Sequence, residues 1–180
     1  MNKIRNRIKW EMEATKLFFG RVFRNLIINS CGGSYIVPGF IRKLIYNLCG
    51  MKVATRDIFP KCFFGGTNIE IGKGSFINYG CYFDGSERVI IKENVNIAMK
   101  CTFITSSHEI ATSKHRAGKT KKIAIIVEDG CWIGAESRIL PGVRIGKGCV
   151  IGAGSVVTSD CEDNCLYVGI PARKVRKLEP

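Results

Sequence analysis

The chain holds only two histidines, His108 and His115, and both lie in a polar, basic stretch between residues 106 and 122. Histidine is the side chain that most often transfers protons near neutral pH, although a lone histidine usually needs no functional account. Two histidines cannot supply a metal site that needs three, so we expect no metal centre. Thr105-Ser106-Ser107-His108 opens the stretch. The position of His108 must therefore be set by the secondary-structure element that ends just before Ser106.

The 180-residue chain is strongly basic, with 28 Lys and Arg against 15 Asp and Glu and a formal charge of +13. This balance favours polyanionic or phosphate-bearing partners: nucleic acid, an anionic membrane face or a phosphorylated cofactor. We expect no nucleic-acid partner, because the sequence contains no binding motif and no interleaving of aromatic with basic residues.

Nine cysteines are scattered along the chain without a Cys-x-x-Cys pair. This distribution matches neither a disulfide framework nor a zinc site, so we predict free cysteines packed as small hydrophobes in a reducing, cytoplasmic compartment. No secretory signal is visible, because Arg21 and Arg24 interrupt the early apolar stretch. The charge-free run at residues 25–41 is too short and too polar for a spanning helix.

Aliphatic and aromatic residues recur with a strict period of six over most of the chain. This period fits neither the helical repeat near 3.6 residues nor simple strand alternation. It fits a triangular coil in which each hexad supplies one short strand and one turn. The positions are Ile71, Ile77, Phe83, Ile91, Ile97 and Phe103, then Val127, Ile133, Ile139, Ile145, Ile151 and Val157, with Gly85 to Arg88 interrupting the count.

The residue two before each of these positions should also point inward, because strand side chains alternate. Most residues there are small, as a narrow interior demands, and four cysteines are thereby explained as core filler. Glycine often follows the inward residue, where it permits a turn conformation that a side chain would hinder. The residues two positions before the period-six residues are Cys81 and Cys101, then Ile125, Cys131, Ser137, Val143, Cys149 and Ser155. The glycines that follow period-six residues are Gly72, Gly134, Gly146 and Gly152.

This pattern resembles the hexapeptide-repeat acyltransferases over roughly residues 66 to 176. The resemblance implies an all-β solenoid, namely a left-handed parallel β-helix with a short N-terminal helical segment and an extruded loop. We expect a basic N-terminal helical segment at residues 1–60 and the β-helix acyltransferase domain at residues 61–180, with the loop at residues 106–122.

Residues 1–60 lack the hexad pattern and hold 11 Lys and Arg against 3 Asp and Glu. We expect an amphipathic helix over residues 10–29 and a second helix over residues 41–48 that ends at Gly50. Two roles are open for this segment. It could cap the first coil, as a solenoid requires, or it could dock peripherally on the anionic inner membrane face.

His108 resembles the histidine that begins the loop in galactoside, maltose and polysaccharide O-acetyltransferases. The resemblance implies that His108 is the general base, which takes a proton from an acceptor hydroxyl as the oxygen attacks the thioester of acetyl-CoA. The implied activity is O-acetylation of a saccharide in surface or capsular polysaccharide biosynthesis, by direct transfer in a ternary complex. Glu109 stands where proline is common, and either orients the imidazole or faces solvent. We expect His115 to be a loop or interface residue.

The resemblance also implies a binding site for acetyl-CoA, the co-substrate. Residues 129–135 match the start of the family's CoA-binding face, residues 151–158 match the groove for the pantetheine arm, and residues 168–173 match its closing motif. Ser159 stands where the family often has lysine. Guanidinium groups suit the CoA phosphates, although a solvated basic tail is the alternative. The implied cofactor-binding residues are Trp132, Ala135, Ala153, Thr158, Arg173 and Arg176.

Asn78 and Asp84 flank the turn before the second set of repeats. The resemblance implies that they bind hydroxyls of the saccharide acceptor and face the base across a subunit boundary, although Asn and Asp also stabilise turns. Equivalent faces of a triangular prism can close under cyclic symmetry, so we predict a homotrimer whose active site lies between subunits.

Two other functions stay open, and a third is excluded. A xenobiotic (antibiotic) acetyltransferase of the same fold usually carries a longer helical tail than the one that ends here after Leu178. A non-catalytic scaffold β-helix is the other open alternative. A γ-type carbonic anhydrase shares the β-helix but needs three zinc histidines, which this chain lacks.

Overall fold

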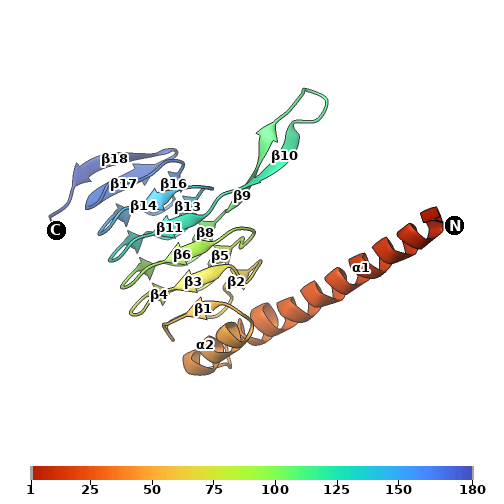
Figure 1. Ribbon diagram of the computed structural model, residues 1–180. Helices are drawn as coiled ribbons and strands as arrows, with labels where there is room; N and C mark the ends of the chain where they lie inside the picture. Colours follow the sequence, from red (N-terminus) through yellow and green to blue (C-terminus); the bar gives the residue numbers. More distant parts are fainter. Residues whose placement is uncertain (1, 180) are drawn as a thin grey trace.

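The computed structural model, which describes residues 2–179, is a stack of triangular coils from which one helix and one β-hairpin project (Figure 1). Each coil contributes one short strand to each of three sheets, and the strands pair in parallel from coil to coil. The chain thus forms the left-handed parallel β-helix that the hexad pattern and its family resemblance predict.

The three sheets are named A, B and C in the order in which the chain visits them. Sheet A contains β1 (Lys52–Val53), β3 (Ile69–Ile71), β6 (Val89–Ile91), β11 (Ile125–Val127) and β14 (Arg144–Ile145). Sheet B contains β4 (Phe76–Ile77), β7 (Asn96–Ile97), β12 (Trp132–Ile133), β15 (Val150–Ile151), β17 (Cys165–Gly169) and β18 (Ala172–Lys177). Sheet C contains β2 (Phe63–Phe64), β5 (Tyr82–Phe83), β8 (Thr102–Phe103), β13 (Arg138–Ile139) and β16 (Val156–Val157).

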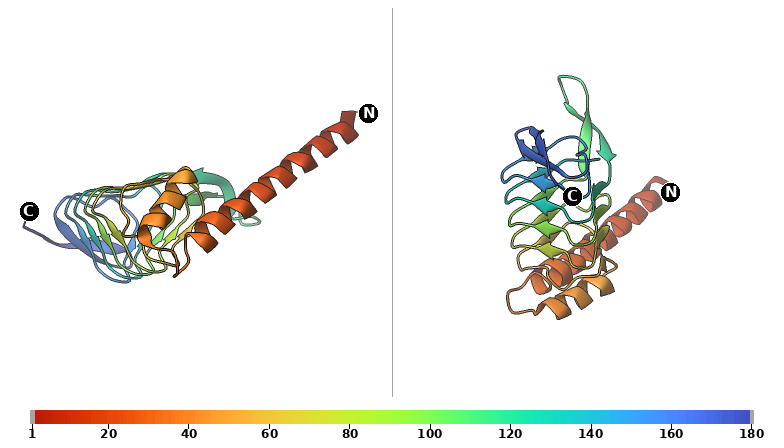
Figure 2. Two further views of the ribbon diagram at one scale, coloured as in Figure 1. Left: turned by 90° about the horizontal axis from the view of Figure 1, so that it is seen from below. Right: turned by 90° about the vertical axis from the view of Figure 1, so that its left-hand side faces the viewer.

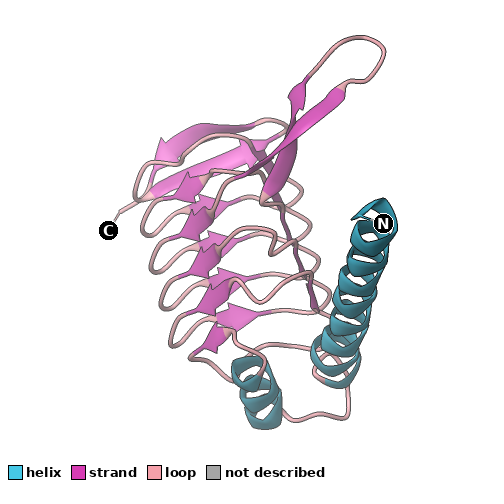
Figure 3. Cartoon of the chain, turned by 45° about the vertical axis from the view of Figure 1, so that its right-hand side comes forward, coloured by secondary structure: helices cyan, strands magenta, loops and turns pink. Residues whose placement is uncertain are grey.

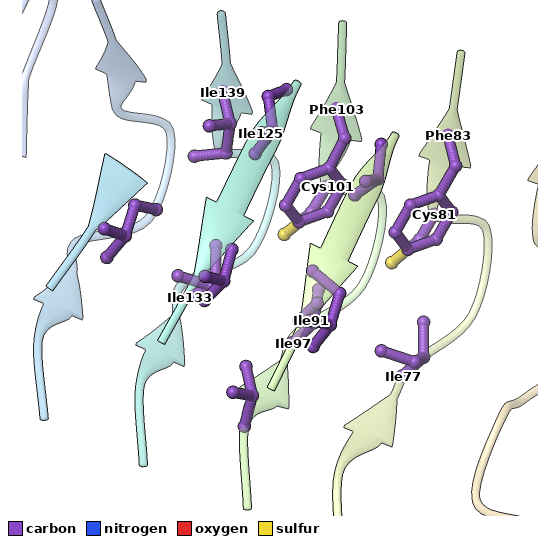
Figure 4. Packing of buried hydrophobic residues seen from close by; sticks show 14 of the residues in the cluster. Ile77, Cys81, Phe83, Ile91, Ile97, Cys101, Phe103, Ile125, Ile133 and Ile139 are labelled. Atoms are coloured by element: carbon purple, nitrogen blue, oxygen red, sulfur yellow. The ribbon is translucent and has the colours of Figure 1, made fainter. Parts of the chain in front are cut away.

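The core is a set of side-chain columns that run along the axis of the coils (Figure 4). All of the period-six positions are at most 2% exposed, and so are the small residues two before them, which confirms the predicted interior. On sheet C the Phe83 and Phe103 rings stack with centroids 4.8 Å apart and nearly parallel planes, and Phe64 continues the stack at 5.0 Å. Cys81 and Cys101 fill the space beside these rings, so both thiols serve packing.

The glycines that follow inward residues are required by close approach between coils. Gly134 does not have a positive φ; a Cβ there would lie 2.5 Å from the backbone nitrogen of Ala153 in the next coil. The left-handed turn conformation falls instead two residues later in the hexad, as at Gly154 with φ +69°. The expectation that these glycines are needed for a turn conformation is therefore wrong, and they are needed because neighbouring coils approach closely.

Residues before the first coil form α1 (Asn2–Asn25), a short π-helix η1 (Leu26–Cys31) and α2 (Gly39–Leu48). The first helix was expected over residues 10–29; it begins at Asn2 and changes to π-helical geometry after Asn25. Gly50 ends the second helix with φ +93°, as predicted. The first strand, β1, starts at Lys52, ahead of the boundary expected at residue 61.

The cap on the first coil comes from η1 and α2. Ile28 and Tyr46 are fully buried against the first coil, and the side chain of Asn29 bonds both the N–H and the carbonyl of Phe64. In contrast, α1 extends away from the stack, with its far end clear of the coils in both views of Figure 2. Within the N-terminal segment, η1 and α2 therefore cover the first coil, whereas α1 projects from the molecule.

The predicted loop at residues 106–122 is a β-hairpin, which we call the arm (Figure 3). Its strands, β9 (Ser106–Ile110) and β10 (Ala117–Lys122), pair antiparallel. The arm leaves after β8 of sheet C and returns into β11 of sheet A. It therefore projects from the corner between sheets C and A, which lies opposite sheet B.

Candidate functional site

His108 lies on β9 of the arm with its side chain exposed. Its Nδ1 atom is 2.9 Å from the carbonyl oxygen of Gly118 on β10. A carbonyl oxygen only accepts hydrogen bonds, so Nδ1 is the donor, and in the neutral imidazole Nε2 keeps its lone pair. The facing strand thus fixes both the tautomer and the orientation that a general base needs.

Glu109 does not orient the imidazole. Successive strand side chains point to opposite faces, so Glu109 and His108 lie on different faces of the arm. The Glu109 carboxylate pairs instead with Lys121 at 3.6 Å. Both side chains are about half exposed, so this ion pair contributes little to stability.

Asp84 anchors the base of the arm. Its Oδ2 accepts hydrogen bonds from the backbone N–H and the hydroxyl of Thr105 and from the hydroxyl of Ser106, while Oδ1 accepts from Ser86. Partial burial acts to raise the pKa of Asp84, but the hydrogen bonds from Ser106, Ser86 and Thr105 outweigh it and hold the pKa below its ordinary value. Asp84 is therefore ionised and largely occupied by its own chain.

A shallow groove of about 410 Å³ lies on the outer face of sheet B. Asn78 and Trp132 both line it, so two of the predicted site residues come together here. The Trp132 side chain is 58% exposed, as its position out of phase with the core predicted. The groove is lined by Phe76, Asn78, Asn96, Ile97, Ala98 and Trp132.

Trp132 and Arg176 belong to the same row of side chains across sheet B. The register places Trp132 beside Val150, Val150 beside Leu166, and Leu166 beside Arg176. At a strand spacing of about 4.8 Å, three steps place the backbones of Trp132 and Arg176 about 14 Å apart. An exposed aromatic ring and a guanidinium group thus share one face of this sheet.

The C-terminal cations are ordered by β18, which pairs antiparallel with β17. The basic residues after Gly169 are thus part of a paired strand, although Arg173 and Arg176 are exposed to solvent. Lys174 is neutralised by Glu162 at 2.7 Å, whereas neither Arg173 nor Arg176 has an acidic partner among residues 2–179. These two guanidinium groups are free to bind phosphate oxygens, which fits the chemistry of a CoA-type ligand.

The three remaining predicted cofactor residues divide between two corners. Ala135 and Ala153 lie at the corner between sheets B and C, in consecutive coils joined by a hydrogen bond from Gly154 N–H to the Ala135 carbonyl. Thr158 is exposed at the corner between sheets C and A, two coils beyond the start of the arm. Sheet C separates the two groups.

The imidazole of His108 and the groove on sheet B do not meet within one chain, because the arm leaves from the opposite corner. The residues that sequence reasoning missed are Asn96 and Phe76 in the groove and Thr105 and Ser106 at the base of the arm. Asn96 and Phe76 occupy the same position in their hexads as Trp132, so the repeat phase could have identified them. His115 lies at the exposed tip of the arm.

Residues 2–179 contain neither a cluster of metal ligands nor a helix that could span a membrane. No group of three or more His, Cys, Asp or Glu side chains is arranged to hold a metal ion. No described helix combines the length and apolar character needed to cross a membrane.

Comparison with known proteins relates the fold and the site to described families. A family model for the bacterial transferase hexapeptide, spanning six repeats, matches residues 124–159. A galactoside O-acetyltransferase of Lactococcus lactis is 34% identical over 136 residues, which cover 71% of this chain and 66% of that protein. The chain spans 57–66% of the length of the first curated relatives it matches.

Solved structures match over more of the chain. A maltose O-acetyltransferase from Clostridium difficile superposes with a TM-score of 0.76 at 30% identity, covering 89% of this chain and 87% of that one. A hexapeptide-repeat acetyltransferase of Vibrio cholerae in complex with acetyl-CoA superposes with a TM-score of 0.73 at 31% identity, covering 94% and 90%. Taken with the hexad core and the arm that bears His108, these matches show that the chain belongs to the hexapeptide-repeat acetyltransferase family.

Proposed function

We propose that this protein transfers the acetyl group of acetyl-CoA to a hydroxyl of a saccharide. The observation that carries the proposal is the bond from His108 Nδ1–H to the Gly118 carbonyl, which leaves Nε2 free to accept a proton. Relatives named galactoside and maltose O-acetyltransferases support a saccharide acceptor. We place the reaction in the formation of a surface or capsular polysaccharide or its precursor.

In the proposed step His108 Nε2 takes the proton of the acceptor hydroxyl as that oxygen bonds to the thioester carbonyl carbon. The carbon–sulfur bond then breaks, and the CoA thiolate leaves with the proton that the imidazolium returns. Donor and acceptor bind together, so no acetyl group is carried by the protein. An alcohol is a poor nucleophile until a base removes its proton, and this assistance typically contributes ~10²–10⁴-fold.

We assign acetyl-CoA binding to Trp132, Ala135, Ala153, Thr158, Arg173 and Arg176, with no metal. The guanidinium groups of Arg173 and Arg176, which have no acidic partner within residues 2–179, suit the phosphates, and the exposed Trp132 ring suits the cofactor arm. Asn78 would bind acceptor hydroxyls from the groove. Asp84 would act on the acceptor mainly by holding the arm, because four hydrogen bonds already occupy its carboxylate.

The active form would be a homotrimer in which the arm of one subunit reaches the sheet B groove of the next. The position of the arm, at the corner opposite sheet B, supports this assignment, because one chain alone leaves the base and the groove apart. Sedimentation velocity should give a trimer. A stable monomer with full activity would contradict the shared site.

We also propose that α1 contacts an anionic membrane from the cytoplasm. Trp10, Leu17, Phe18, Phe19 and Phe23 are each more than half exposed on a helix that packs on no coil. Such a surface is rarely left in water. Exposed cations accompany these side chains, and each cation near an anionic surface contributes about 1 kcal/mol. The exposed cations are Arg7, Lys9, Lys16 and Arg21.

Vesicle flotation tests the membrane contact. Reversing Lys9, Lys16 and Arg21 to glutamate should abolish binding to phosphatidylserine vesicles at low salt. Reversing Lys73, Lys92 and Lys100 on the solenoid, which are also exposed, should leave binding largely in place. Equal loss with both sets would indicate a general effect of net charge and would contradict a role for α1.

Acetyl transfer to a panel of sugars and nucleotide sugars, followed by mass spectrometry, tests the activity itself. Transfer to a saccharide that disappears in His108→Ala supports the proposal. Transfer only to hydroxylated antibiotics would favour the xenobiotic alternative, and no release of CoA with any hydroxylated acceptor would favour a non-catalytic scaffold. A thiol-reactive dye should be avoided, because all nine cysteines are free.

A further inference from the structure

A second pocket, of about 400 Å³, lies at the end of sheet B nearest the helical cap. It opens between the first coil, the start of α2 and the loop that joins η1 to α2. None of its residues takes part in the site proposed above. The side chains that matter here are Tyr35, Arg42, Arg56, Asp57, Phe59 and Tyr79.

Aromatic rings form one wall of this pocket. Tyr35 is 66% exposed and Tyr79 is 41% exposed, with ring centroids 6.2 Å apart. Phe59 packs edge-on against Tyr79 at 4.8 Å and so supports its ring from behind. Exposed tyrosine rings offer an apolar face and a polar tip, which suits the mixed C–H and hydroxyl surface of a sugar ring.

Two charged groups in the pocket have free hydrogen-bonding capacity. Asp57 uses its backbone N–H and carbonyl for Thr55 and Ile77, but its carboxylate has no partner among the described residues. The Arg56 guanidinium likewise has no side-chain hydrogen bond or ion pair within residues 2–179. A carboxylate accepts and a guanidinium donates several hydrogen bonds, so together they match the hydroxyls of a sugar.

A buried arginine makes the pocket rigid. Arg42 is 4% exposed and donates hydrogen bonds to the carbonyls of Gly32, Ser34, Val37 and Ile58. These bonds join the loop that carries Tyr35 to the first coil. A pocket whose wall is already fixed loses little conformational entropy when a ligand binds.

The pocket lies next to the groove that contains Asn78. Phe59 in the pocket and Asn78 in the groove occupy equivalent positions in consecutive coils, because the Phe59 N–H bonds to Ile77 and the Asn78 N–H to Ile97. Phe76, which lines the groove, packs on Phe59 with ring centroids 5.1 Å apart. A ligand longer than one sugar unit could therefore occupy both.

We propose that this pocket binds the sugar unit next to the one that is acetylated, so that the preferred acceptor contains at least two sugar units. This inference depends on the proposed acetyl transfer to a saccharide. It goes beyond that proposal by naming the length of the acceptor and the residues that sense it, namely Tyr35 and Tyr79 by stacking and Arg56 and Asp57 by hydrogen bonds.

Matched pairs of acceptors test the length preference in the full-length protein. The pairs are glucose with maltose, galactose with lactose, and N-acetylglucosamine with chitobiose. The wild type should favour the disaccharide of at least one pair in kcat/KM by about tenfold, which corresponds to about 1.4 kcal/mol. Tyr35→Ala and Asp57→Asn should each reduce that ratio several-fold through KM. No preference in any pair would overturn the proposal.

Tyr82→Ala is the matched control. Tyr82 is 42% exposed, close to the value for Tyr79, but it stacks on Phe63 on the outer face of sheet C. The control should keep the disaccharide preference, and an equal loss in the control would overturn the role of the pocket. Circular dichroism verifies the fold of each variant.

Saturation-transfer NMR with the same sugars, without acetyl-CoA, separates the inference from the proposed function. Disaccharide signals that vanish in Tyr35→Ala but persist in Tyr82→Ala support the pocket as a saccharide site even if no sugar is acetylated. Failure of acetyl transfer alone would then contradict only the proposed function. Disaccharide binding that is unchanged in Tyr35→Ala and Asp57→Asn would overturn the inference whatever the activity.

Discussion

His108 Nδ1 lies 2.9 Å from the carbonyl oxygen of Gly118 on the facing strand of the arm. The two residues belong to strands whose register is fixed by pairing of His108 with Thr120 and of Ser107 with Lys121. The imidazole is therefore oriented by backbone geometry, and no acidic side chain is needed for that purpose. The direction in which Nε2 points therefore depends on the hairpin being formed.

Replacement of His108 by alanine should remove most acetyl transfer and leave the fold unchanged, because the side chain is exposed. Loss of a general base typically costs ~10²–10⁴-fold in kcat. Steady-state kinetics with circular dichroism measures both quantities. His115→Ala, at the tip of the same arm, is the control and should cost much less. Small, equal effects of the two substitutions would mean that His108 is not the base.

Asp84→Asn should weaken the attachment of the arm in a pH-dependent manner. The hydrogen bonds to the Asp84 carboxylate lower its pKa in the folded protein, so its contribution to stability is complete above the unfolded value of about 3.9 and is lost as the pH falls through the folded pKa. The free energy of unfolding should fall by about 1–3 kcal/mol at pH 7. Urea titrations between pH 7 and pH 2 should show this difference shrinking, and a constant difference would contradict the assignment.

Arg173→Ala combined with Arg176→Ala should raise KM for acetyl-CoA and barely change KM for the acceptor. Each well-ordered charge-assisted contact to phosphate is worth roughly 1.5–3 kcal/mol. The effect should be smaller for a donor that lacks the 3′-phosphate. Lys174→Ala is the control, because Glu162 already neutralises this lysine. An unchanged KM for acetyl-CoA would show that the two guanidinium groups only face solvent.

Mixed trimers test the shared site directly. Co-expression of His108→Ala with the Arg173→Ala, Arg176→Ala double variant should restore activity, because some interfaces then combine an intact arm with an intact sheet B. Random assembly of equal amounts gives about a quarter of the interfaces this composition. Activity of the isolated mixed species provides the measurement. No recovery above the sum of the two variants would indicate that each chain works alone.

Phe83→Ala should destabilise the solenoid strongly. The ring is fully buried between Phe64 and Phe103, and removal of a buried phenylalanine typically costs about 3–5 kcal/mol. Chemical denaturation followed by circular dichroism measures the loss. Phe63→Ala, on the outer face of the neighbouring coil, should cost far less. Similar losses would contradict the central place of the aromatic stack.

The sequence predicted the interior of the solenoid well, because a narrow triangular core leaves little choice. Ile133 and Cys131 could be assigned to the core from phase alone, and Trp132 to the outer wall by the same rule. Asn96 and Phe76 share the hexad phase of Trp132, so the phase could also have identified them as its neighbours on sheet B. The two strands of the arm have no alternation of apolar residues, so the sequence pattern could not predict that they pair as a hairpin.

The pocket near Tyr35 could not be predicted from the sequence either. It depends on Arg42, which lies within an amphipathic helix and would ordinarily be assigned to solvent. Its burial results from hydrogen bonds to carbonyl groups of a loop that has no regular structure. Contacts of this kind follow from the three-dimensional path of the chain, which residue types alone do not specify.

The arm also increases the sequence separation between residues that pair across neighbouring coils. Phe83 and Phe103 pair across 20 positions, whereas Phe103 and Ile139 pair across 36 because the arm lies between them. The entropy of closing a loop grows only with the logarithm of its length, by about 0.6 kcal/mol for each doubling, so the arm adds less than that to the free-energy cost of folding. The length and sequence of its tip can therefore change at almost no thermodynamic cost to the solenoid, as long as the pairing that holds His108 against Gly118 is kept.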